Sequence, residues 1–549
     1  MKILNLILFS SLITMKSKLF FIAFALSFLG LRAQTIPFSY SVKIVPVTVN
    51  NLPGLHSFVT AQSGGKWLFI GGRRDGLHAR QPFSSFPVAQ NNTDIFVVDI
   101  NTKQFWQSSV NVLPIGLKEQ LQSTNMNFYQ DADTLYIIGG YGYSNTAVDH
   151  ITYPSLTSVS VSGLISAITS SSSIIPFFKQ TTDQRFAVNG GQLGKIGNEY
   201  YLVGGHRFDG RYNPMGNPTY TQTYVDGIRK FNLSNQGTSI TVNNYTVITD
   251  QIHLHRRDYN LLPQVFPDGS LGYTISSGVF QVGIDLPFLY PVDIKSSGYF
   301  PQTSFNQYLS NYHSAKMAVY DSLSNTMHSF FFGGLSQYYY SGTTLVQDNN
   351  VPFVKTISRV SRNASGNLQE VVFPNEMPAM IGASAEFIYN HSLPHYSNEV
   401  LKMSQISADS VLVGHIAGGI QSPQLNPFTN NNTGVTSAHN VFYEVWLVKN
   451  TLSGIQELNG KNPVRLNVFP NPGGENMSVN IVAPYDGVLD LFVTDANGKL
   501  LKDVFVGKIV KGFGTYILTD ISGLSNGTYM FNFVFDGHFS VMEKVMIDK

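Results

Sequence analysis

The central part of the chain repeats one pattern, in which a short apolar strand runs into two small residues. Five copies end in paired glycines, at Gly71-Gly72, Gly139-Gly140, Gly204-Gly205, Gly333-Gly334 and Gly418-Gly419. A degenerate copy, residues 273–278, fills the gap between the third and the fourth of these pairs. The first positions, 71, 139, 204, 276, 333 and 418, lie 57 to 85 residues apart. Six units of this size, with several strands each, predict a radial β-propeller rather than a solenoid or a sandwich.

The first unit continues after its glycine pair with an apolar strand at residues 94–99 and then Phe105-Trp106. Glycines suit this place because strands crowd near the axis, where a residue without Cβ permits close approach and positive φ. The apolar strand that ends in two glycines resembles the kelch repeat, which implies a kelch-type propeller. The units exceed the roughly 50 residues of a kelch repeat, so we expect the excess in loops. We expect residues 38–47 to pair beside residues 440–447 and close a ring of six blades.

The last part of the chain alternates apolar and polar residues at 489–494 and at 528–534. Asp-Gly and Asn-Gly pairs interrupt this alternation, and such pairs favour hairpin turns. The pairs lie at residues 486–487, 497–498, 526–527 and 536–537. The pattern therefore predicts a small β-sandwich over residues 464–549.

Short motifs follow one another in this C-terminal module: Val-Phe-Pro-Asn-Pro at 468–472, the Gly-Lys turn at 498–499, Gly-Thr-Tyr at 527–529 and a terminal strand ending in Lys549. Their order resembles the C-terminal sorting domain of type IX secretion substrates. The resemblance implies that the type IX machinery recognises residues 464–549 and exports the protein, which is then released or anchored at the outer surface of a Gram-negative cell.

The N-terminus has the composition of a secretory signal peptide over residues 1–33. Lys16 and Lys18 precede a thirteen-residue, largely apolar run at 19–31, and Ala33-Gln34 offers a cleavage point. The preceding residues form a second apolar stretch, so Met15 is a candidate true start. The run is short for a membrane span, although a retained anchor helix is the alternative. The expected domains are the propeller at 34–450, a linker at 451–463 and the sorting domain.

Composition excludes several classes of partner and cofactor. The 549 residues carry a net charge of +1, and only 13% of them are charged, so neither nucleic acid nor an anionic bilayer is an expected partner. The chain has no Cys, which rules out disulfides, a lipoprotein anchor and thiolate metal sites. The mature protein is expected to have no transmembrane span, and no cofactor is implied.

Candidate site residues cluster at two places in the repeating units, after the glycine pairs and before the innermost strands. His56 and Asn189 each stand fifteen residues before the first glycine of their own unit, which predicts equivalent positions at the start of an inner strand. The candidates for ligand binding are His56, Arg73, Arg74, His78, His206, Arg207 and His255. The candidates for catalysis are Arg257, Asp258 and His313.

Two kinds of chemistry are open for these residues. His56, His255 and His313 offer neutral nitrogens to zinc or copper, but none has a recognised ligand spacing. Alternatively, Arg73, Arg207 and Arg257 present guanidinium groups to sugar or carboxylate oxygens, and Asp258 or Glu386 serves as a base. Tyrosines 338–340 would then offer stacking faces. This layout is similar to that of kelch-type sialic-acid mutarotases, although no catalytic motif carries over.

Each of these residues also has a structural interpretation. Arg and His after a glycine pair can hydrogen-bond the carbonyls of a neighbouring blade, and tyrosines 338–340 can form an ordinary strand. The serine-rich residues 158–173 contain no nucleophile elbow and are expected to form a long loop. Five further histidines are expected on exposed loops or strands, namely His253, His328, His391, His395 and His439.

Two functional classes therefore remain open. As a recognition module, the exported propeller would hold a glycan or a surface protein. As a carbohydrate-active enzyme of the mutarotase, lyase or hydrolase type, it would use an axial set of Arg, His and Asp side chains. Because the propeller fold hosts both roles and no strong catalytic motif is present, the sequence favours binding.

Overall fold

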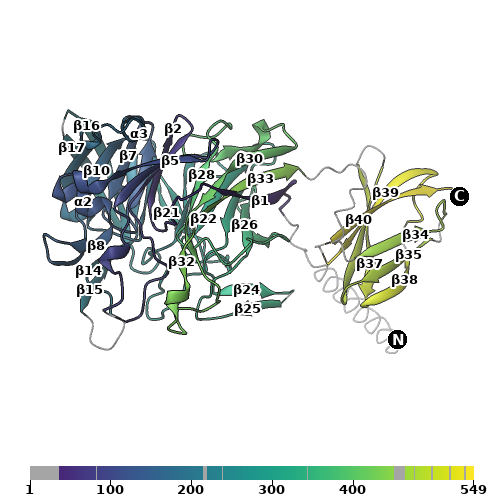
Figure 1. The fold of residues 1–549 in the computed structure, drawn as a ribbon. Coiled ribbons are helices and arrows are strands. Elements are labelled where there is room, and N and C mark those ends of the chain that lie inside the picture. Colours follow the sequence, from purple (N-terminus) through teal and green to yellow (C-terminus); the bar gives the residue numbers. More distant parts are fainter. Residues whose placement is uncertain are drawn as a thin grey trace, which may run out of the picture. The chain divides into compact units, whose positions relative to one another are not determined.

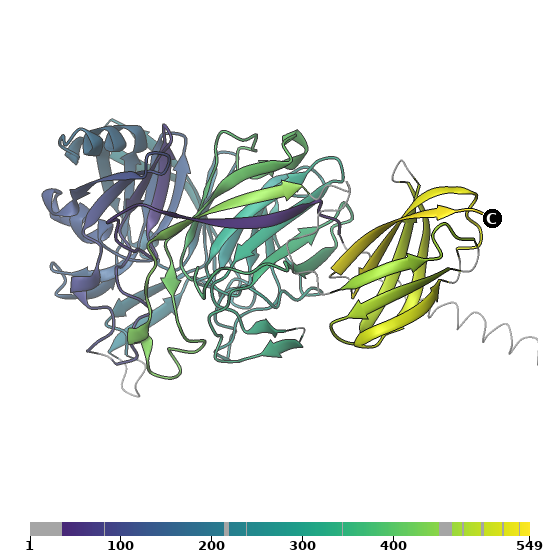
Figure 2. The same cartoon turned by 45° about the vertical axis from the view of Figure 1, so that its right-hand side comes forward.

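The computed structural model describes residues 36–81, 83–213, 219–237, 239–342, 344–449, 464–474, 477–495, 499–518, 521–536 and 539–549. The expected signal peptide at 1–33 and the linker at 451–463 lie outside the described residues. The chain divides into two compact units, Met1–Asn450 and Thr451–Lys549, which are described separately. Strands dominate both units (Figures 1 and 2), which confirms the expected all-β class. Within the described part of the chain, no helix is long and apolar enough to cross a membrane.

The described residues of the first unit form six successive antiparallel sheets with at least four strands each. Sheet 1 contains β2 (Val59–Ser63), β3 (Lys66–Ile70), β4 (Asp94–Asp99) and β5 (Gln104–Ser109). Sheet 2 contains β6 (Asn127–Asp131), β7 (Thr134–Ile138), β10 (Ser155–Ser160) and β11 (Phe178–Thr182). Sheet 3 contains β12 (Gln192–Ile196), β13 (Glu199–Val203), β16 (Gly227–Gln236) and β17 (Ser239–Thr249). In each sheet, sequential strands are neighbours.

The remaining three sheets continue this order. Sheet 4 contains β18 (Asn260–Val265), β19 (Leu271–Ser276), β20 (Val292–Lys295) and β21 (Gly298–Pro301). Sheet 5 contains β22 (Ala315–Asp321), β23 (Thr326–Phe332), β26 (Ile357–Arg362) and β27 (Leu368–Val372), with the short β29 (Leu401–Lys402) added parallel to β22. Sheet 6 contains β28 (Glu386–Tyr389), β30 (Ser410–Ala417), β33 (Val441–Lys449) and β1 (Tyr40–Thr48).

Sheet 6 joins the two ends of the first unit. Strand β1 pairs antiparallel with β33, with Tyr40 opposite Lys449 and Thr48 opposite Val441. This confirms the expected pairing of residues 38–47 beside 440–447. Because the partners are about 400 residues apart in sequence, the pairing ties the beginning of the unit to its end.

The paired small residues behave as the repeat predicted. All five glycine pairs have positive φ at both positions, for example 67° and 81° at Gly71 and Gly72. In the degenerate unit the corresponding pair is Ser277-Gly278, with φ of 56° and 95°, one residue later than the position counted from the sequence. A Cβ at Gly139 would lie 1.8 Å from the Val188 carbonyl oxygen, so the glycine permits close approach to the neighbouring unit.

After several of these pairs the chain forms a two-stranded hairpin. The labelled hairpin strands lie on one side of the sheets, at the bottom of Figure 1. The hairpins are β8 (Tyr141–Ser144) with β9 (Asp149–Thr152), β14 (His206–Gly210) with β15 (Tyr220–Tyr224), β24 (Tyr338–Ser341) with β25 (Thr344–Gln347), and β31 (Ile420–Gln421) with β32 (Ser437–Ala438). The tyrosine run at 338–340 is therefore one strand of a hairpin, with Tyr340 exposed.

Two short helices, α2 (Ile115–Leu121) and α3 (Val161–Thr169), interrupt this β architecture. Helix α3 corrects the expectation of a loop at 158–173. Val161, Leu164 and Ile168 recur with helical spacing and are fully buried in one core with sheets 1 and 2. The serines of this segment suggested a loop, but the helical spacing of its apolar residues determines its structure.

Two of the histidines expected to be exposed are buried, which is a second correction. His328 is only 2% exposed; its Nδ1 is 2.8 Å from Ser361 Oγ and its ring packs against Phe38. His439 is buried against Tyr443, with its Nε2 3.0 Å from the phenol oxygen. Both occupy interior positions because a neutral imidazole with a hydrogen-bond partner is tolerated in a core.

The second unit is a sandwich of two antiparallel sheets, as its pattern predicted. One sheet contains β34 (Arg465–Phe469), β35 (Met477–Ala483) and β38 (Gly512–Leu518), and the other contains β37 (Leu500–Ile509), β36 (Gly487–Thr494), β39 (Gly527–Phe535) and β40 (Phe539–Ile547). Alternate residues of both sheets, including Val479, Leu491 and Phe533, form one shared core. The unit therefore has its own hydrophobic core, separate from those of the first unit.

Candidate functional site

The starts of the six innermost strands meet in a closed ring of backbone hydrogen bonds. Each ring residue lies two positions before the first strand of its sheet, and its N–H donates to the carbonyl of the ring residue of the preceding sheet. The bonds run from Ser57 to Ser384 (3.0 Å), Asn125 to Ser57 (3.2 Å), Gly190 to Asn125 (3.2 Å), Asp258 to Gly190 (2.7 Å), His313 to Asp258 (2.8 Å) and Ser384 to His313 (2.8 Å). The ring thus links all six sheets around one centre.

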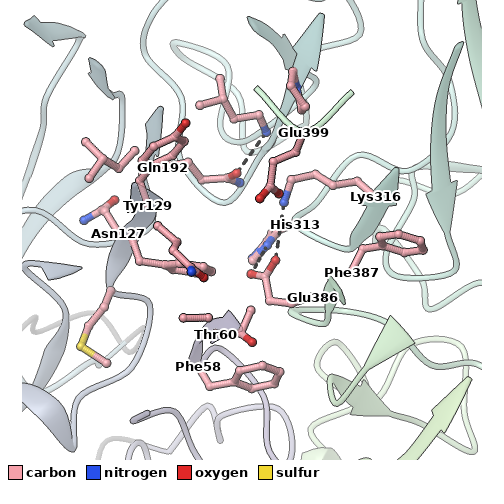
Figure 3. Close-up of a pocket in the computed structure, with 18 of the residues that line it drawn as sticks. Phe58, Thr60, Asn127, Tyr129, Gln192, His313, Lys316, Glu386, Phe387 and Glu399 are labelled. Atoms are coloured by element: carbon pink, nitrogen blue, oxygen red, sulfur yellow. Dashed lines mark hydrogen bonds and ion pairs between the residues drawn. The ribbon is translucent and has the colours of Figure 1, made fainter. Parts of the chain in front are cut away.

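A cavity of about 190 Å³ extends from this ring along the innermost strands (Figure 3). Each of the six sheets contributes lining residues from its first strand, and five ring residues also line the cavity. Because the ring residues precede the strands, the ring lies at one end of the cavity. Three sequence candidates line the cavity: Asp258 and His313, which belong to the ring, and Glu386, which lies in β28.

Three titratable side chains lie close together in the cavity: His313, Lys316 and Glu386 (Figure 3). His313 Nε2 is 2.9 Å from Glu386 Oε1, but the orientation of the ring falls outside hydrogen-bond geometry. Lys316 Nζ is 3.8 Å from Glu386 Oε2, which is beyond hydrogen-bonding distance. Both contacts are therefore electrostatic, and the Lys316 ammonium keeps its donors available to the cavity.

Burial and charge act in opposite directions on this group. The side chains of Lys316 and Glu386 are only 13% and 10% exposed. Burial lowers the pKa of Lys316 because the charged ammonium loses hydration, and Glu386 opposes that shift. Burial also disfavours ionised Glu386, but the charges of Lys316 and His313 outweigh it and hold the pKa of Glu386 below its ordinary value. At neutral pH the cavity therefore contains an ionised carboxylate.

Asp258 lies at the ring end of the cavity and is paired with Arg257. The Arg257 guanidinium donates to Asp258 Oδ2 through Nη1 and to the Tyr224 hydroxyl through Nε at 3.1 Å. Burial disfavours the charge on Arg257, but Asp258 outweighs this effect and raises the pKa of Arg257. Arg257 therefore neutralises Asp258 from outside the cavity and does not line it.

Several lining residues present buried polar atoms without a hydrogen-bond partner among the described residues. They include Thr60 Oγ1, Asn127 Oδ1 and Asn398 Oδ1. Asn127 Nδ2 donates to the carbonyls of Ile138 and Val188, so its orientation is fixed and only its oxygen is left over. A buried acceptor without a donor is costly, so a donor from water or a ligand would stabilise these atoms.

Most sequence candidates lie outside the cavity and have protein partners. Arg73 is buried, donates to Asp75 through Nε at 2.8 Å and to Asn91 Oδ1 through Nη1 at 2.8 Å, and stacks on Phe86. Asp75 also lies 3.6 Å from His56 Nε2. Burial lowers the pKa of His56, so the imidazole is neutral at pH 7. These contacts brace the loop after the first glycine pair from within its own unit, and not through the carbonyls of a neighbouring blade.

Arg74 and His78 complete that loop. Arg74 Nη2 donates to Asp94 at 2.6 Å, which ties the loop to β4. The His78 ring stacks on Phe86, and burial lowers its pKa to about 4. Both side chains therefore hold the loop and are not aimed at the cavity.

The candidates from the third and fourth units also contact protein side chains outside the cavity. His206 Nε2 is 2.8 Å from Asn189 Oδ1, and its backbone bridges to Asn189 just as Arg73 bridges to His56. This confirms that His56 and Asn189 occupy equivalent positions. Arg207 pairs with Asp209 at the surface. His255 Nδ1 lies 2.6 Å from Asp226.

The structure does not bring the three metal candidates together. His56, His255 and His313 face different carboxylates, Asp75, Asp226 and Glu386, respectively. Among the residues that the structure describes, no three His, Asp or Glu side chains are placed to hold one metal ion. The structure therefore gives no support to the predicted histidine metal centre, because the three histidines face three different carboxylates.

Sequence reasoning missed Lys316, Glu399, Asn127 and Asn398, which all line the cavity. One signal was available for the first of them. Lys316 follows a buried alanine and precedes four buried residues in β22, and a lysine is rarely found in such a strand without a partner or a function. Asn127 and Asn398 carry no comparable signal, since a single amide near the end of a strand or in a loop is ordinary.

Comparisons with known structures give weak similarities of overall shape. The structure of YjhT is 9% identical, and the alignment covers 72% of this chain and 95% of that chain with a TM-score of 0.40. A glycoside hydrolase family 43 arabinoxylan arabinofuranohydrolase from Bacillus subtilis is 12% identical, with coverage of 91% and 98% and a TM-score of 0.26. Neither similarity carries an argument about function. Among curated proteins, none matches this chain.

A family comparison identifies the second unit. Residues 467–548 match the secretion system C-terminal sorting domain, which covers nearly all of the sandwich. The match agrees with the motifs at 468–472 and 527–529 and with the terminal strand. Its presence indicates export by the type IX secretion system to the cell surface or beyond. The C-terminal unit of this chain is a secretion system C-terminal sorting domain.

Proposed function

We propose that the first unit is a six-bladed, kelch-type β-propeller whose blades are sheets 1 to 6. The closed ring of hydrogen bonds supports this arrangement, because each sheet contacts the next and the sixth contacts the first. The pairing of β1 with β33 supports it as well, since a strand from the beginning of the unit completes the last sheet. The small residues with positive φ at the end of each second strand are the feature shared with kelch repeats.

The exported propeller binds a small polyhydroxylated ligand, the terminal sugar of a glycan, in the cavity along its axis. The observation that carries this proposal is the lining itself. Buried acceptors on Thr60, Asn127 and Asn398 lack donors among the described residues, and the Lys316 ammonium lacks a close acceptor. A sugar hydroxyl both donates and accepts, so one ring of hydroxyls satisfies both needs.

The size of the cavity sets the class of ligand. About 190 Å³ is far more than the roughly 10–15 Å³ that one water molecule needs, yet less than the roughly 300 Å³ at which drug-sized pockets begin. A single sugar unit fits between these limits. Phe58, Phe387 and Tyr389 also line the cavity and give the apolar face of a sugar something to pack against. Such an enclosed space favours a glycan end over a protein surface as the ligand.

Calorimetric titration of the full-length exported protein with neutral hexoses tests this function. We expect saturable binding with one site per chain. Replacing Lys316 by Met removes a charge-assisted hydrogen bond and weakens binding by at least about tenfold. Lys66→Met is the matched control, because Lys66 pairs with Asp99 outside the cavity and its loss leaves the affinity unchanged. Absence of binding by every hexose, in a protein that unfolds cooperatively, would refute the proposal.

A second candidate function is acid–base catalysis on the bound sugar. It is favoured by one observation, the 2.9 Å approach of His313 Nε2 to Glu386 Oε1 within the cavity. A carboxylate close to an imidazole stabilises the imidazolium that forms when the ring accepts a proton, and proton transfer at an anomeric oxygen needs little more. Exchange of anomers followed by nuclear magnetic resonance tests it. Catalysed exchange that disappears in His313→Gln, in a variant that still binds sugar, supports an enzyme; uncatalysed exchange leaves a binding protein.

A further inference from the structure

The charges that line the cavity are not evenly compensated. Three carboxylates, those of Asp258, Glu386 and Glu399, line it together with one lysine and one histidine. Asp258 is neutralised by Arg257, and Glu386 faces both Lys316 and His313. Glu399 therefore remains as the carboxylate without a permanent cationic partner.

Glu399 lies at the end of the cavity away from the ring. Its side chain is 41% exposed, and its Oε1 is 3.1 Å from Nε2 of the exposed His391. That same imidazole nitrogen is also 3.2 Å from the Gln62 side-chain amide nitrogen. The tautomer of His391 decides whether its Nε2 accepts from Gln62 or donates to Glu399 Oε1. The other carboxylate oxygen of Glu399, Oε2, makes no hydrogen bond or ion pair with the described residues, so it is open to a donor from the cavity.

A tight turn holds Glu399 in place. The Tyr396 N–H donates to the Val400 carbonyl at 2.8 Å, and the Glu399 N–H donates to the Tyr396 carbonyl at 2.9 Å. Glu399 itself has φ of 72°, a left-handed conformation that side chains other than glycine seldom adopt. Non-glycine residues in this region are retained where the surroundings require them, and they concentrate at functional sites. The turn therefore presents this carboxylate to the cavity in one defined position.

The buried side-chain amides of Asn127 and Asn398 are a second, independent indication, because their oxygens lack hydrogen-bond donors among the described residues. Asn127 and Asn398 are 1% and 5% exposed, and each has a side-chain oxygen without a partner among the described residues. Asn398 precedes Glu399 in the chain and donates through Nδ2 to the Gln264 carbonyl at 3.0 Å, so its oxygen cannot exchange places with its nitrogen. A carboxylate oxygen and an amide oxygen on consecutive residues can both accept hydrogen bonds from a group that only donates.

The cavity also contains aromatic rings close to this carboxylate. Tyr129, Tyr273 and Tyr389 line it, and the charge of Glu399 contributes to raising the pKa of each, after the larger effect of burial. The phenols are thus neutral and lie within electrostatic reach of Glu399. Aromatic faces attract cations, whereas they give an anion no comparable stabilisation.

We propose that the sugar recognised by this cavity is an amino sugar, whose protonated amine is bound by Glu399 and the Asn398 side-chain oxygen. This inference rests on the proposed sugar-binding function and adds the charge class of the ligand. An ammonium group supplies three donors and one positive charge, which matches the negative carboxylate with its free Oε2 and the amide oxygen. An acidic sugar would place a second carboxylate against Glu399 and is disfavoured.

Matched sugars that differ in one group test the proposal. The full-length protein is titrated with glucose, glucosamine and glucuronate, and with galactose, galactosamine and galacturonate, near pH 6, where the amine is protonated. We expect the amino sugar of at least one series to bind about fivefold tighter than its neutral parent, the upper range for a partly exposed ion pair. The acidic sugar of that series is expected to bind more weakly than the parent.

Glu399→Gln keeps the size of the side chain and removes its charge. In this variant the amino and neutral sugars are expected to bind equally, and the acidic sugar is expected to recover. Glu376→Gln, an exposed position outside the cavity, serves as the control and retains the wild-type order. Equal binding of neutral and amino sugars by the wild type, or a preference that survives Glu399→Gln, overturns the inference but leaves sugar binding intact. Failure of all six sugars to bind overturns both.

Discussion

The pairing of Lys316 with Glu386 in the cavity allows a quantitative test that needs no ligand. Replacing Lys316 by Met removes the ammonium and keeps most of the side-chain volume. Glu386 then remains in a site where its carboxylate is only 10% exposed and where His313 is its remaining charged neighbour. We expect the free energy of unfolding to fall, because a buried charge that loses its partner keeps its desolvation cost.

The distance between the two groups sets the magnitude. At 3.8 Å, two unit charges interact by about 4 kcal/mol with the effective dielectric constant of roughly 20 that suits protein sites. His313 retains part of the compensation, so we expect Lys316→Met to cost about 2–3 kcal/mol. Glu386→Gln is expected to cost a similar amount, because it leaves the ammonium unpaired.

A double-mutant cycle isolates the interaction. Unfolding in urea, followed by circular dichroism at pH 7, gives the free energies of the wild type, the two single variants and Lys316→Met/Glu386→Gln. Because the double variant buries neither charge, we expect it to be no less stable than either single variant, with a coupling energy of about 2–4 kcal/mol. Single effects that simply add, within about 0.5 kcal/mol, would refute the claim that these groups compensate each other.

Three further predictions test other parts of the structure. Gly139→Ala is expected to destabilise the first unit by at least about 2–3 kcal/mol in urea unfolding, because the new Cβ would lie 1.8 Å from the Val188 carbonyl oxygen and φ is 68°. The control Gly64→Ala, with φ of 58° but no atom within 4 Å of its Cβ, should cost only about 1–2 kcal/mol. Equal losses of stability in the two variants would contradict the close packing at Gly139. Burial lowers the pKa of His328 to about 3, so its neutral form stabilises the fold above pH 6.5. This contribution to the free energy of unfolding is lost as pH falls from 6.5 towards 3, by up to about 1.4 kcal/mol per pH unit. The free energy of unfolding of His328→Gln should depend less steeply on pH, and the same pH dependence in variant and wild type would show that the imidazole titrates normally. Removing residues 464–549 is expected to leave the first unit folded with an unchanged melting temperature, because the second unit has a core of its own. The truncated protein should be retained inside the cell, because it lacks the sorting domain. Surface display of the truncated protein would contradict the assignment of the export signal.

Local features of the fold could be predicted because they depend on neighbouring residues. The glycine pairs follow apolar strands, and only residues without Cβ adopt positive φ there at low cost, so their positions marked the repeating units. Helix α3 shows where this reasoning failed. Its serines suggested a loop, whereas the intervals of three and four residues between Val161, Leu164 and Ile168 are those of a helix with one buried face.

The candidate site was only partly predictable. Asp258, His313 and Glu386 were identified, and all three line the cavity, but Arg73, Arg74 and His78 brace a loop. A sequence shows which side chains are polar, but it does not show whether a polar partner such as Asp75 or Asp94 will satisfy them. In the sequence alone, a charged residue that is buried among protein partners cannot be told apart from one that binds a ligand.

The amino-acid sequence by itself determined the strand pattern, the six turns with positive φ, the pairing of residues 40–48 with the end of the first unit, and the C-terminal sorting domain. The strands, turns and sorting domain follow from short-range preferences or from contiguous motifs. The pairing of the two ends, about 400 residues apart, follows from the repeat pattern, because a ring of repeated units has to close. The tertiary structure alone decided that Lys316, Glu386 and Glu399 line one cavity with Asn127, from three different sheets and a loop. The physical reason is that ring closure brings together residues separated by up to about 270 positions, and the charge balance at that centre exists only once the ring has formed.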